Sequence, residues 1–220
     1  MKALVVDDHA LIRDALVRVL INLAPGAQVW EAADLRLAFH AMEREPDLDL
    51  VLLDLTLPAK HGMTGLQELR EKYPATAVVV VSATADRESV KRALESGAMG
   101  FIPKSSSNEV LQSALRLVLA GGVYVPPEIL GNNDGAAPLE TSTAGRSTTP
   151  AGIGLTGRQA QILALMMKGE SNKLICRELN LAESTVKNQI TAILKALEVT
   201  SRTQAVLAVA KLGLVLPGAA

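Results

Sequence analysis

Short apolar runs alternate with amphipathic segments along the first 120 residues. The apolar runs predict strands at residues 3–6, 28–31, 50–53, 77–82 and 100–102. The segments between and after them carry apolar residues at helical spacing and predict helices at 10–23, 35–44, 63–72, 87–96 and 107–120. Central strands without polar alternation are buried on both faces. The pattern therefore predicts a doubly wound, five-stranded parallel sheet of the flavodoxin-like type.

The alternation of strand and helix patterns stops after residue 120, and a purely helical pattern begins after residue 154. Residues 131–154 are rich in Gly, Ala, Ser, Thr and Pro and contain almost no large apolar side chain. Such a stretch buries too little apolar surface to offset the entropy lost on ordering, which predicts a flexible tether. We expect one domain at 1–125, a linker at 126–153 and a second domain at 154–216.

The second domain shows helical patterns and no strand pattern. The predicted helices are 156–168, 171–179, 183–197 and 202–212. Thr156 and Ser171 are good N-cap residues. The second and third helices are separated only by a tight turn of Asn180, Leu181 and Ala182, which is the spacing of a helix-turn-helix. The sequence predicts a small all-α helix-turn-helix domain.

Composition narrows the class of protein. The chain has 220 residues, and its apolar runs are too short to span a membrane. Its start turns acidic after one short apolar run, so we expect no signal peptide and a cytoplasmic protein without membrane association. The single cysteine, Cys176, excludes an internal disulfide framework and a cysteine metal cluster, and its helical setting favours a core role.

Charge is divided unevenly between the two halves of the chain. Residues 1–125 hold 13 Lys and Arg against 16 Asp and Glu, a net charge of −3. Residues 150–220 hold 8 Lys and Arg against 4 Asp and Glu, a net charge of +4. This division favours contact of the second domain alone with a polyanion.

Polar side chains follow four of the predicted strands. Asp7 and Asp8 follow the first strand, Asp54 the third and Lys104 the fifth, while Ser82 ends the fourth. Ligands of open parallel sheets bind beyond the carboxyl ends of the strands, so these groups converge there. Three carboxylates need a compensating cation, and oxygen ligands favour Mg²⁺. The convergence predicts attack by the Asp54 carboxylate on a phosphoryl donor, giving an aspartyl phosphate.

Four segments carry a family resemblance over residues 1–120. They are Val5-Val6-Asp7-Asp8-His9, Leu52-Leu53-Asp54-Leu55 with Pro58 and Gly62, Val81-Ser82-Ala83, and Gly100-Phe101-Ile102-Pro103-Lys104. In this order and spacing they resemble the receiver domain of two-component response regulators.

The resemblance implies a role for each pocket residue. Asp54 is the phosphoacceptor for a sensor histidine kinase, and Lys104 pairs with the phosphoryl group. Ser82 is the switch hydroxyl, and Phe101 is the aromatic residue that turns inward when Ser82 is recruited. The implied Mg²⁺ ligands are Asp7, Asp8, Asp54 and the carbonyl of Thr56.

The third helix of the second domain is amphipathic. Its apolar stripe comprises Val186, Ile190, Ile193, Leu194 and Leu197. The other face carries side chains suited to bases and phosphates in a DNA major groove: Thr185, Lys187, Asn188, Gln189, Thr191 and Lys195. By spacing alone this face is equally consistent with plain solvation.

Further segments resemble the LuxR-type helix-turn-helix between about 155 and 213. They are Leu155-Thr156-Gly157-Arg158, residues 169–176, Ser184-Thr185-Val186-Lys187-Asn188, and residues 197–205. With the receiver in front, the whole chain is similar to the NarL/FixJ family of transcriptional regulators. The resemblance places Lys187, Asn188 and Gln189 at double-stranded DNA, with Thr185, Thr191 and Lys195 as lesser candidates. It also implies a dimer contact on the fourth helix, at Ala205, Val206, Val209 and Ala210.

The second domain departs from the family pattern at four positions. Gln159 and Gln161 stand where the family usually has glutamates, and Gln189 where it often has histidine. Ala182 occupies a turn position often held by a capping serine, so we expect a less firmly started third helix.

The leading hypothesis is a transcription factor, not an enzyme, in which phosphorylation of Asp54 gates homodimerisation and DNA binding. An aspartyl-phosphate phosphatase or transferase would need a second acid/base and a substrate cap, and neither is recognised. The remaining alternative is a regulator that binds DNA without phosphorylation and uses its receiver only for protein interaction.

Overall fold

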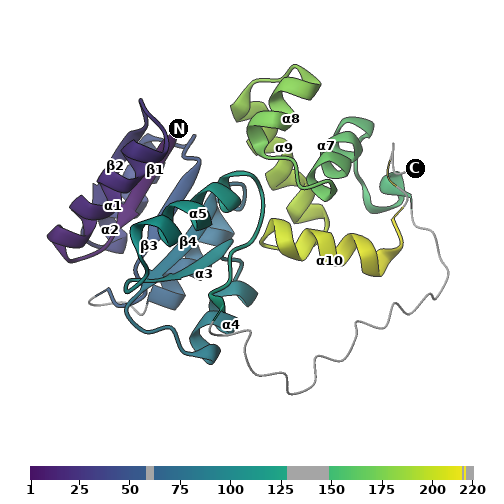
Figure 1. Cartoon of the computed structure of the whole chain (residues 1–220). Helices are drawn as coiled ribbons and strands as arrows, with labels where there is room; N and C mark the ends of the chain where they lie inside the picture. Colours follow the sequence, from purple (N-terminus) through teal and green to yellow (C-terminus); the bar gives the residue numbers. More distant parts are fainter. Residues whose placement is uncertain (58–61, 128–148, 215, 217–220) are drawn as a thin grey trace.

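The computed structural model describes residues 1–57, 62–127, 149–214 and 216 (Figure 1). It divides into an N-terminal α/β domain and a C-terminal helical domain, which lie side by side. Pro58 and most of the predicted linker, residues 128–148, fall outside the described residues.

The N-terminal domain is built on one parallel sheet. Its strands occur in the order β2-β1-β3-β4-β5, and every neighbouring pair is parallel. They are β1 (Lys2–Val6), β2 (Gln28–Ala32), β3 (Leu50–Leu53), β4 (Ala77–Ser82) and β5 (Gly100–Pro103). The predicted doubly wound, five-stranded parallel sheet is therefore confirmed. The order of the strands reverses between β1 and β3, which is where such sheets bind ligands.

Five helices cover the two faces of this sheet. They are α1 (Ala10–Leu23), α2 (Leu35–Arg44), α3 (Gly62–Lys72), α4 (Arg87–Glu95) and α5 (Asn108–Leu119). Helices α2, α3 and α4 pack on one face of the sheet, and α1 and α5 pack on the other. Strand β3 is fully buried between these layers, because its four residues Leu-Val-Leu-Leu supply apolar side chains to both faces.

The C-terminal domain consists of helices around one apolar core. They are α7 (Gly157–Met167), α8 (Asn172–Leu179), α9 (Glu183–Ala196) and α10 (Arg202–Leu212). The predicted apolar stripe of α9 is buried in that core. Before α7, Pro150–Ile153 forms a 3₁₀ helix, and Ile153 packs against the same core. This turn occupies the last four residues of the predicted linker, and Ile153 is its residue that packs on the core of the domain.

Capping residues fix the starts of the first two helices of this domain. Thr156 accepts a hydrogen bond from the Gln159 backbone, and the Gln159 side chain accepts one from the Thr156 backbone, forming a complete capping box. Gln159 therefore supplies what a glutamate would supply at this position. Helix α8 is capped by Ser171. Helix α9 starts after Ala182 with no side-chain cap, as its sequence predicts.

None of the helices in the described part of the chain is long and apolar enough to cross a membrane.

The uncapped start of α9 generates a prediction about stability. Ala182 is exposed and has the same extended backbone as the capping residues Thr156 and Ser171, so a serine fits there without strain. We expect Ala182→Ser to raise the free energy of unfolding of the C-terminal domain by about 1 kcal/mol. Chemical denaturation of the full chain measures it, with Thr156→Ala as the comparison expected to lose a similar amount. A serine variant no more stable than the parent would contradict this account of the helix start.

Candidate functional site

The first candidate site lies beyond the carboxyl ends of β1, β3 and β5. Asp7 and Asp54 are almost completely buried there, because each directly follows a buried strand. Lys104, which follows β5, reaches across the gap and pairs with both: its Nζ lies 2.7 Å from Asp7 Oδ2 and 2.8 Å from Asp54 Oδ2. The structure brings together the two carboxylates and the ammonium group that the sequence predicts to converge.

These contacts keep the Lys104 side chain in its charged form. Partial burial acts to lower its pKa, but the hydrogen bonds to Asp54 and Asp7 outweigh burial and raise the pKa above its ordinary value. The ammonium group therefore stays protonated at neutral pH. It neutralises one of the pocket's carboxylates and leaves an excess of negative charge.

Thr56 holds Asp54 in place. Its hydroxyl lies 2.8 Å and 2.7 Å from the two carboxylate oxygens of Asp54, and its backbone N–H donates to Oδ1 at 2.9 Å. These bonds orient the carboxylate that a phosphoryl group would meet. The sequence predicts a role for the Thr56 carbonyl only, so this use of its hydroxyl is additional.

The residues of the pocket fit a divalent cation. One ligand atom from each of Asp7, Asp8, His9 and Asp54 lies within 4.8 Å of the others. Asp7 Oδ2 and Asp8 Oδ1 are buried oxygens that keep acceptor capacity beyond their ion-pair contacts with Lys104 and His9. Oxygen ligands with spare acceptor capacity suit a hard cation such as Mg²⁺. His9 also donates its backbone N–H to Asp7 Oδ1 at 2.8 Å.

The two residues expected to switch occupy different settings. Ser82 is buried at the end of β4, and its Oγ accepts a bond from the Thr84 N–H at 3.3 Å. Phe101 is fully buried in the core beneath α2, α3 and α4, with its N–H bonded to the Tyr124 carbonyl. The inward turn of Phe101 stays a prediction, and in this structure its ring lies inside the core.

The predicted DNA face of α9 is divided between solvent and the N-terminal domain. Thr185, Asn188 and Lys195 are exposed, and Gln189 and Thr191 are half-buried. Lys187 is only 6% exposed. Its Nζ lies 2.7 Å from the Asp47 carbonyl, 3.1 Å from the Leu48 carbonyl and 3.3 Å from Asp49 Oδ1, all in the loop before β3. A central residue of the predicted DNA contact is thus bound by the other domain.

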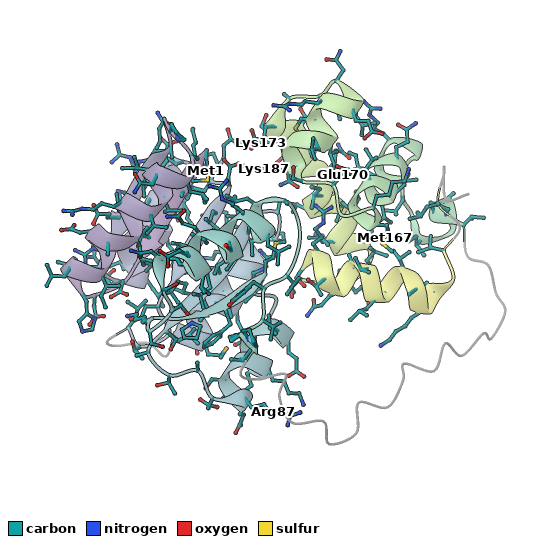
Figure 2. The ribbon with its side chains drawn as sticks, viewed as in Figure 1. Met1, Arg87, Met167, Glu170, Lys173 and Lys187 are labelled. Carbon is teal, nitrogen blue, oxygen red and sulfur yellow. The ribbon has the colours of Figure 1, made fainter. Side chains whose placement is uncertain are left out.

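A second lysine and an acidic pair complete this contact. Lys173 on α8 lies 3.4 Å from Asp49 Oδ2. Figure 2 shows Lys173 and Lys187 at the edge of the C-terminal domain that faces Met1. Burial acts to raise the pKa of Asp49, but hydrogen bonds from Glu183 and the Lys2 backbone, with the charge of Lys187, lower it to about 2. The shared hydrogen bond with Asp49 raises the pKa of Glu183.

Backbone carbonyls provide further contacts between the domains, and Ala75 of the receiver packs against the core of the C-terminal domain. Arg70, at the end of α3, is buried and donates to the carbonyls of Thr76 and Pro74 in its own domain and of Thr200 in the other. Burial lowers its pKa to about 10. Gln204 on α10 donates to the Glu95 carbonyl at the end of α4, at 2.8 Å. The docked C-terminal domain therefore contacts α3, α4 and the loop before β3.

The predicted dimer residues on α10 separate into two kinds. Ala205 and Val209 are buried in the core of the C-terminal domain, whereas Val206 is half-buried and Ala210 is exposed. Two of the four predicted dimer residues therefore pack within the domain. Reasoning from sequence also missed Asp49 and Arg70, since a lone surface-type charge gives no sign that another domain packs on it.

Both domains match known families. Residues 3–116 match the response regulator receiver domain, and residues 154–209 match the bacterial regulatory proteins of the luxR family.

Relatives match nearly the whole chain. The chain is 41% identical to the glycerol metabolism activator of Pseudomonas putida, over 94% of this chain and 93% of the relative. It is 34% identical to the nitrate/nitrite response regulator protein NarL of Escherichia coli K12, over 92% and 91%. A solved two-component response regulator of the LuxR family from Aurantimonas is 32% identical, with a TM-score of 0.54, covering 59% of this chain and 91% of that one.

The geometry of the acidic pocket generates a prediction about metal binding. We expect Mg²⁺ to bind, and Asp8→Asn and Asp54→Asn each to weaken binding by about tenfold or more, because each removes a charged oxygen ligand. Isothermal titration calorimetry of the full chain measures this. Glu71→Gln, an exposed carboxylate on α3, is the matched control for the loss of one charge. Equal Mg²⁺ affinity in all four proteins would place the cation elsewhere.

Proposed function

The chain belongs to the NarL/FixJ family of two-component response regulators, and on this basis we propose that phosphorylation of Asp54 releases its DNA-binding domain from its receiver domain. As a family member it is a transcription factor with a receiver and a LuxR-type helix-turn-helix. The observation that carries the proposal is the burial of Lys187, a predicted DNA contact, against the receiver.

The pocket supports Asp54 as the phosphoacceptor. Its carboxylate is buried, oriented by Thr56 and paired with Lys104. An Asp54 oxygen attacks the phosphorus of a histidine-bound phosphoryl group, forming an O–P bond as the P–N bond to the donor breaks. Lys104 then binds a phosphoryl oxygen in place of the carboxylate. Ser82 ends the neighbouring strand and offers its hydroxyl to another oxygen.

A divalent cation would be held by Asp7, Asp8, Asp54 and, from the family resemblance, the Thr56 carbonyl. When bound, Mg²⁺ neutralises the negative charge that develops on the transferred group. The other roles belong to two residues of this chain. Thr56 orients the attacking Asp54 carboxylate, and Lys104 stays protonated and pairs with the transferred phosphoryl group.

The docked state opposes DNA binding through Lys187. A lysine that contacts DNA must place its ammonium group against a phosphate or a base edge. In the docked state the same group is surrounded by two carbonyls and the Asp49 carboxylate. DNA and the receiver therefore compete for one cation, and the domain arrangement decides which of them binds it.

The phosphorylation pocket and the contact between Asp49 and Lys187 lie at opposite ends of one strand. Asp49 directly precedes β3 and Asp54 directly follows it, so the two sites are joined by one buried four-residue strand. A phosphoryl group adds about 1.5 to 2 negative charges to the pocket and draws on Lys104 and Ser82. We infer that the resulting shift of β3, β4 and α4 weakens the contacts of Asp49 with Lys187 and of Glu95 with Gln204. Two released domains in a homodimer then bind two half-sites, because a single small domain makes few contacts.

The proposal is tested by capturing genomic DNA fragments with the purified full chain, with and without beryllofluoride and Mg²⁺ as a phosphoryl mimic. We expect defined fragments to be enriched only with the mimic, and Asp54→Asn to show no enrichment in either condition. Equal enrichment without the mimic would favour the regulator that ignores phosphorylation. No enrichment in either condition would contradict the assignment of the C-terminal domain.

The competition for Lys187 generates a further prediction. Asp49→Asn removes a charged acceptor and should weaken domain docking by about 2 kcal/mol, roughly thirtyfold in the docking equilibrium. We expect this variant to bind the captured fragments more tightly than the parent without the mimic. Fluorescence anisotropy with one captured fragment measures it. Asp47→Asn is the control, because Asp47 contacts Lys187 through its backbone carbonyl only. Identical affinities in the two variants would argue against Asp49 as the competitor.

A further inference from the structure

A cavity of about 220 Å³ lies between the two domains. Its receiver wall includes Ala24 after α1, Arg70 at the end of α3, and Val118 and Leu119 at the end of α5. The C-terminal domain contributes Arg202, at the start of α10, and the first turn of α8. Because each domain supplies only part of the wall, the cavity is complete only while the domains are docked.

Arg70 brings a buried positive charge to this cavity. Its side chain is only 2% exposed, and its two terminal nitrogens donate to the backbone carbonyls of Pro74, Thr76 and Thr200. Its Nε has no hydrogen-bond partner among the described residues. Burial lowers the pKa of Arg70 to about 10, and no neighbouring carboxylate acts to raise it. A buried guanidinium without a counter-charge is unfavourable, so binding of an anion beside it would stabilise the protein.

Arg202 adds a second guanidinium group from the other domain. Its Nη2 donates to the backbone carbonyls of Met166 and Glu170. Burial lowers the pKa of Arg202 to about 10, although the charge of Glu170 acts to raise it. Both arginines therefore stay charged at neutral pH. A carboxylate is the natural partner of such groups, because its two oxygens match the parallel N–H groups of a guanidinium.

The charges around the cavity favour an anion. Three positive side chains and one negative side chain line it, a net charge of +2: Arg70, Lys173, Arg202 and Asp49. The Asp49 carboxylate already pairs with Lys173 and Lys187. Figure 2 shows Lys173 at the edge of the C-terminal domain that faces Met1, another residue of the cavity wall. Lys173 also belongs to the first turn of α8, where the helix dipole attracts negative charge.

The rest of the wall is mostly apolar. It includes Met99, Val118 and Leu119 of the receiver and Ile190 of α9. An apolar cavity of about 150 Å³ is enough to hold benzene. This cavity therefore has room for a ring or a short branched chain beside the guanidinium groups. Inorganic phosphate would leave the apolar side chains without a partner, so the lining favours an organic acid.

We propose that the cavity between the domains binds a small organic carboxylate with an apolar body, whose carboxylate group pairs with Arg70 and Arg202. Such a ligand contacts both domains and stabilises the docked state. By linkage, any change that separates the domains weakens its binding to the same extent. The site itself rests only on the docked arrangement. Its consequence, a ligand that opposes DNA binding and is bound less tightly after phosphorylation, rests on the proposed function.

Isothermal titration calorimetry of the full chain tests the site with two probes, benzoate and 4-methylpentanoate. We expect both carboxylates to bind. Their uncharged amides, benzamide and 4-methylpentanamide, lack the charge, and inorganic phosphate lacks the apolar body, so each should bind about tenfold more weakly or worse. No binding of either carboxylate would overturn the proposal. Amides or phosphate that bind as tightly as the carboxylates would overturn it as well.

Two variants locate the bound benzoate. Ala24→Leu fills the cavity and keeps every charge, and the extended backbone of Ala24 accepts the larger residue without strain. Arg202→Gln removes one of the two guanidinium groups. Each variant is expected to weaken benzoate binding by about tenfold or more. Arg92→Gln, at an exposed arginine on α4, is the control and should bind benzoate like the parent. Unchanged affinity in either cavity variant would overturn the assigned site.

A titration with beryllofluoride and Mg²⁺ separates failure of the site from failure of the proposed function. The ¹⁹F resonance of bound beryllofluoride shows that the mimic occupies the pocket, and benzoate affinity should then fall by about fivefold or more. Benzoate that binds equally well with and without the bound mimic would support the site but contradict release of the DNA-binding domain. A chain that binds no benzoate, yet captures DNA only with the mimic, would overturn the site and leave the proposed function intact.

Discussion

The docked arrangement depends above all on one buried cation. Lys187 lies on the helix predicted to enter DNA, yet its ammonium group is enclosed by the loop before β3 of the other domain. A buried ammonium is tolerated only with well-placed acceptors, and here two carbonyls and the Asp49 carboxylate provide them. In the proposed mechanism DNA binds the same ammonium group, so the interaction that stabilises docking is the one that opposes DNA binding.

The position of Asp49 connects this contact to the acidic pocket around Asp54. Strand β3 has Asp49 at one end and Asp54 at the other, and it is buried on both faces between two helical layers. A well-packed strand moves as a unit, because close-packed interiors transmit small shifts. In the proposed mechanism, charge added at Asp54 acts on an element whose opposite end contacts the DNA-binding domain. Arg70 on α3 and Glu95 on α4 also contact the DNA-binding domain, so in the proposed mechanism shifts of these two helices affect docking as well.

Local pattern was sufficient to predict the fold. The fully apolar runs of β1, β3 and β4 predict buried parallel strands, and helices α1, α2 and α10 have the predicted bounds. The convergence of Asp7, Asp54 and Lys104 followed from a rule of topology that does not depend on the details of packing. Ala182 likewise indicated an uncapped helix from residue type alone.

Features that depend on contact between distant parts of the chain were not predictable in this way. Asp49 and Arg70 look like ordinary surface charges in the sequence, which gives no sign that each also has a partner in the docked domain. The position of the Phe101 ring inside the core beneath α4 is likewise set by packing between distant segments, which the sequence pattern does not specify. Ala205 and Val209 were expected at a dimer contact, but the amphipathic pattern does not say whether an apolar face packs within a domain or between copies.

The most direct test of this account is the accessibility of the Lys187 amine. Amine labelling of the full chain, followed by mass spectrometry, compares Lys187 with the exposed Lys195 on the same helix. We predict that Lys187 is protected without beryllofluoride and becomes labelled as readily as Lys195 when beryllofluoride and Mg²⁺ are added. Equal protection of Lys187 in both conditions would contradict the release of the DNA-binding domain by phosphorylation.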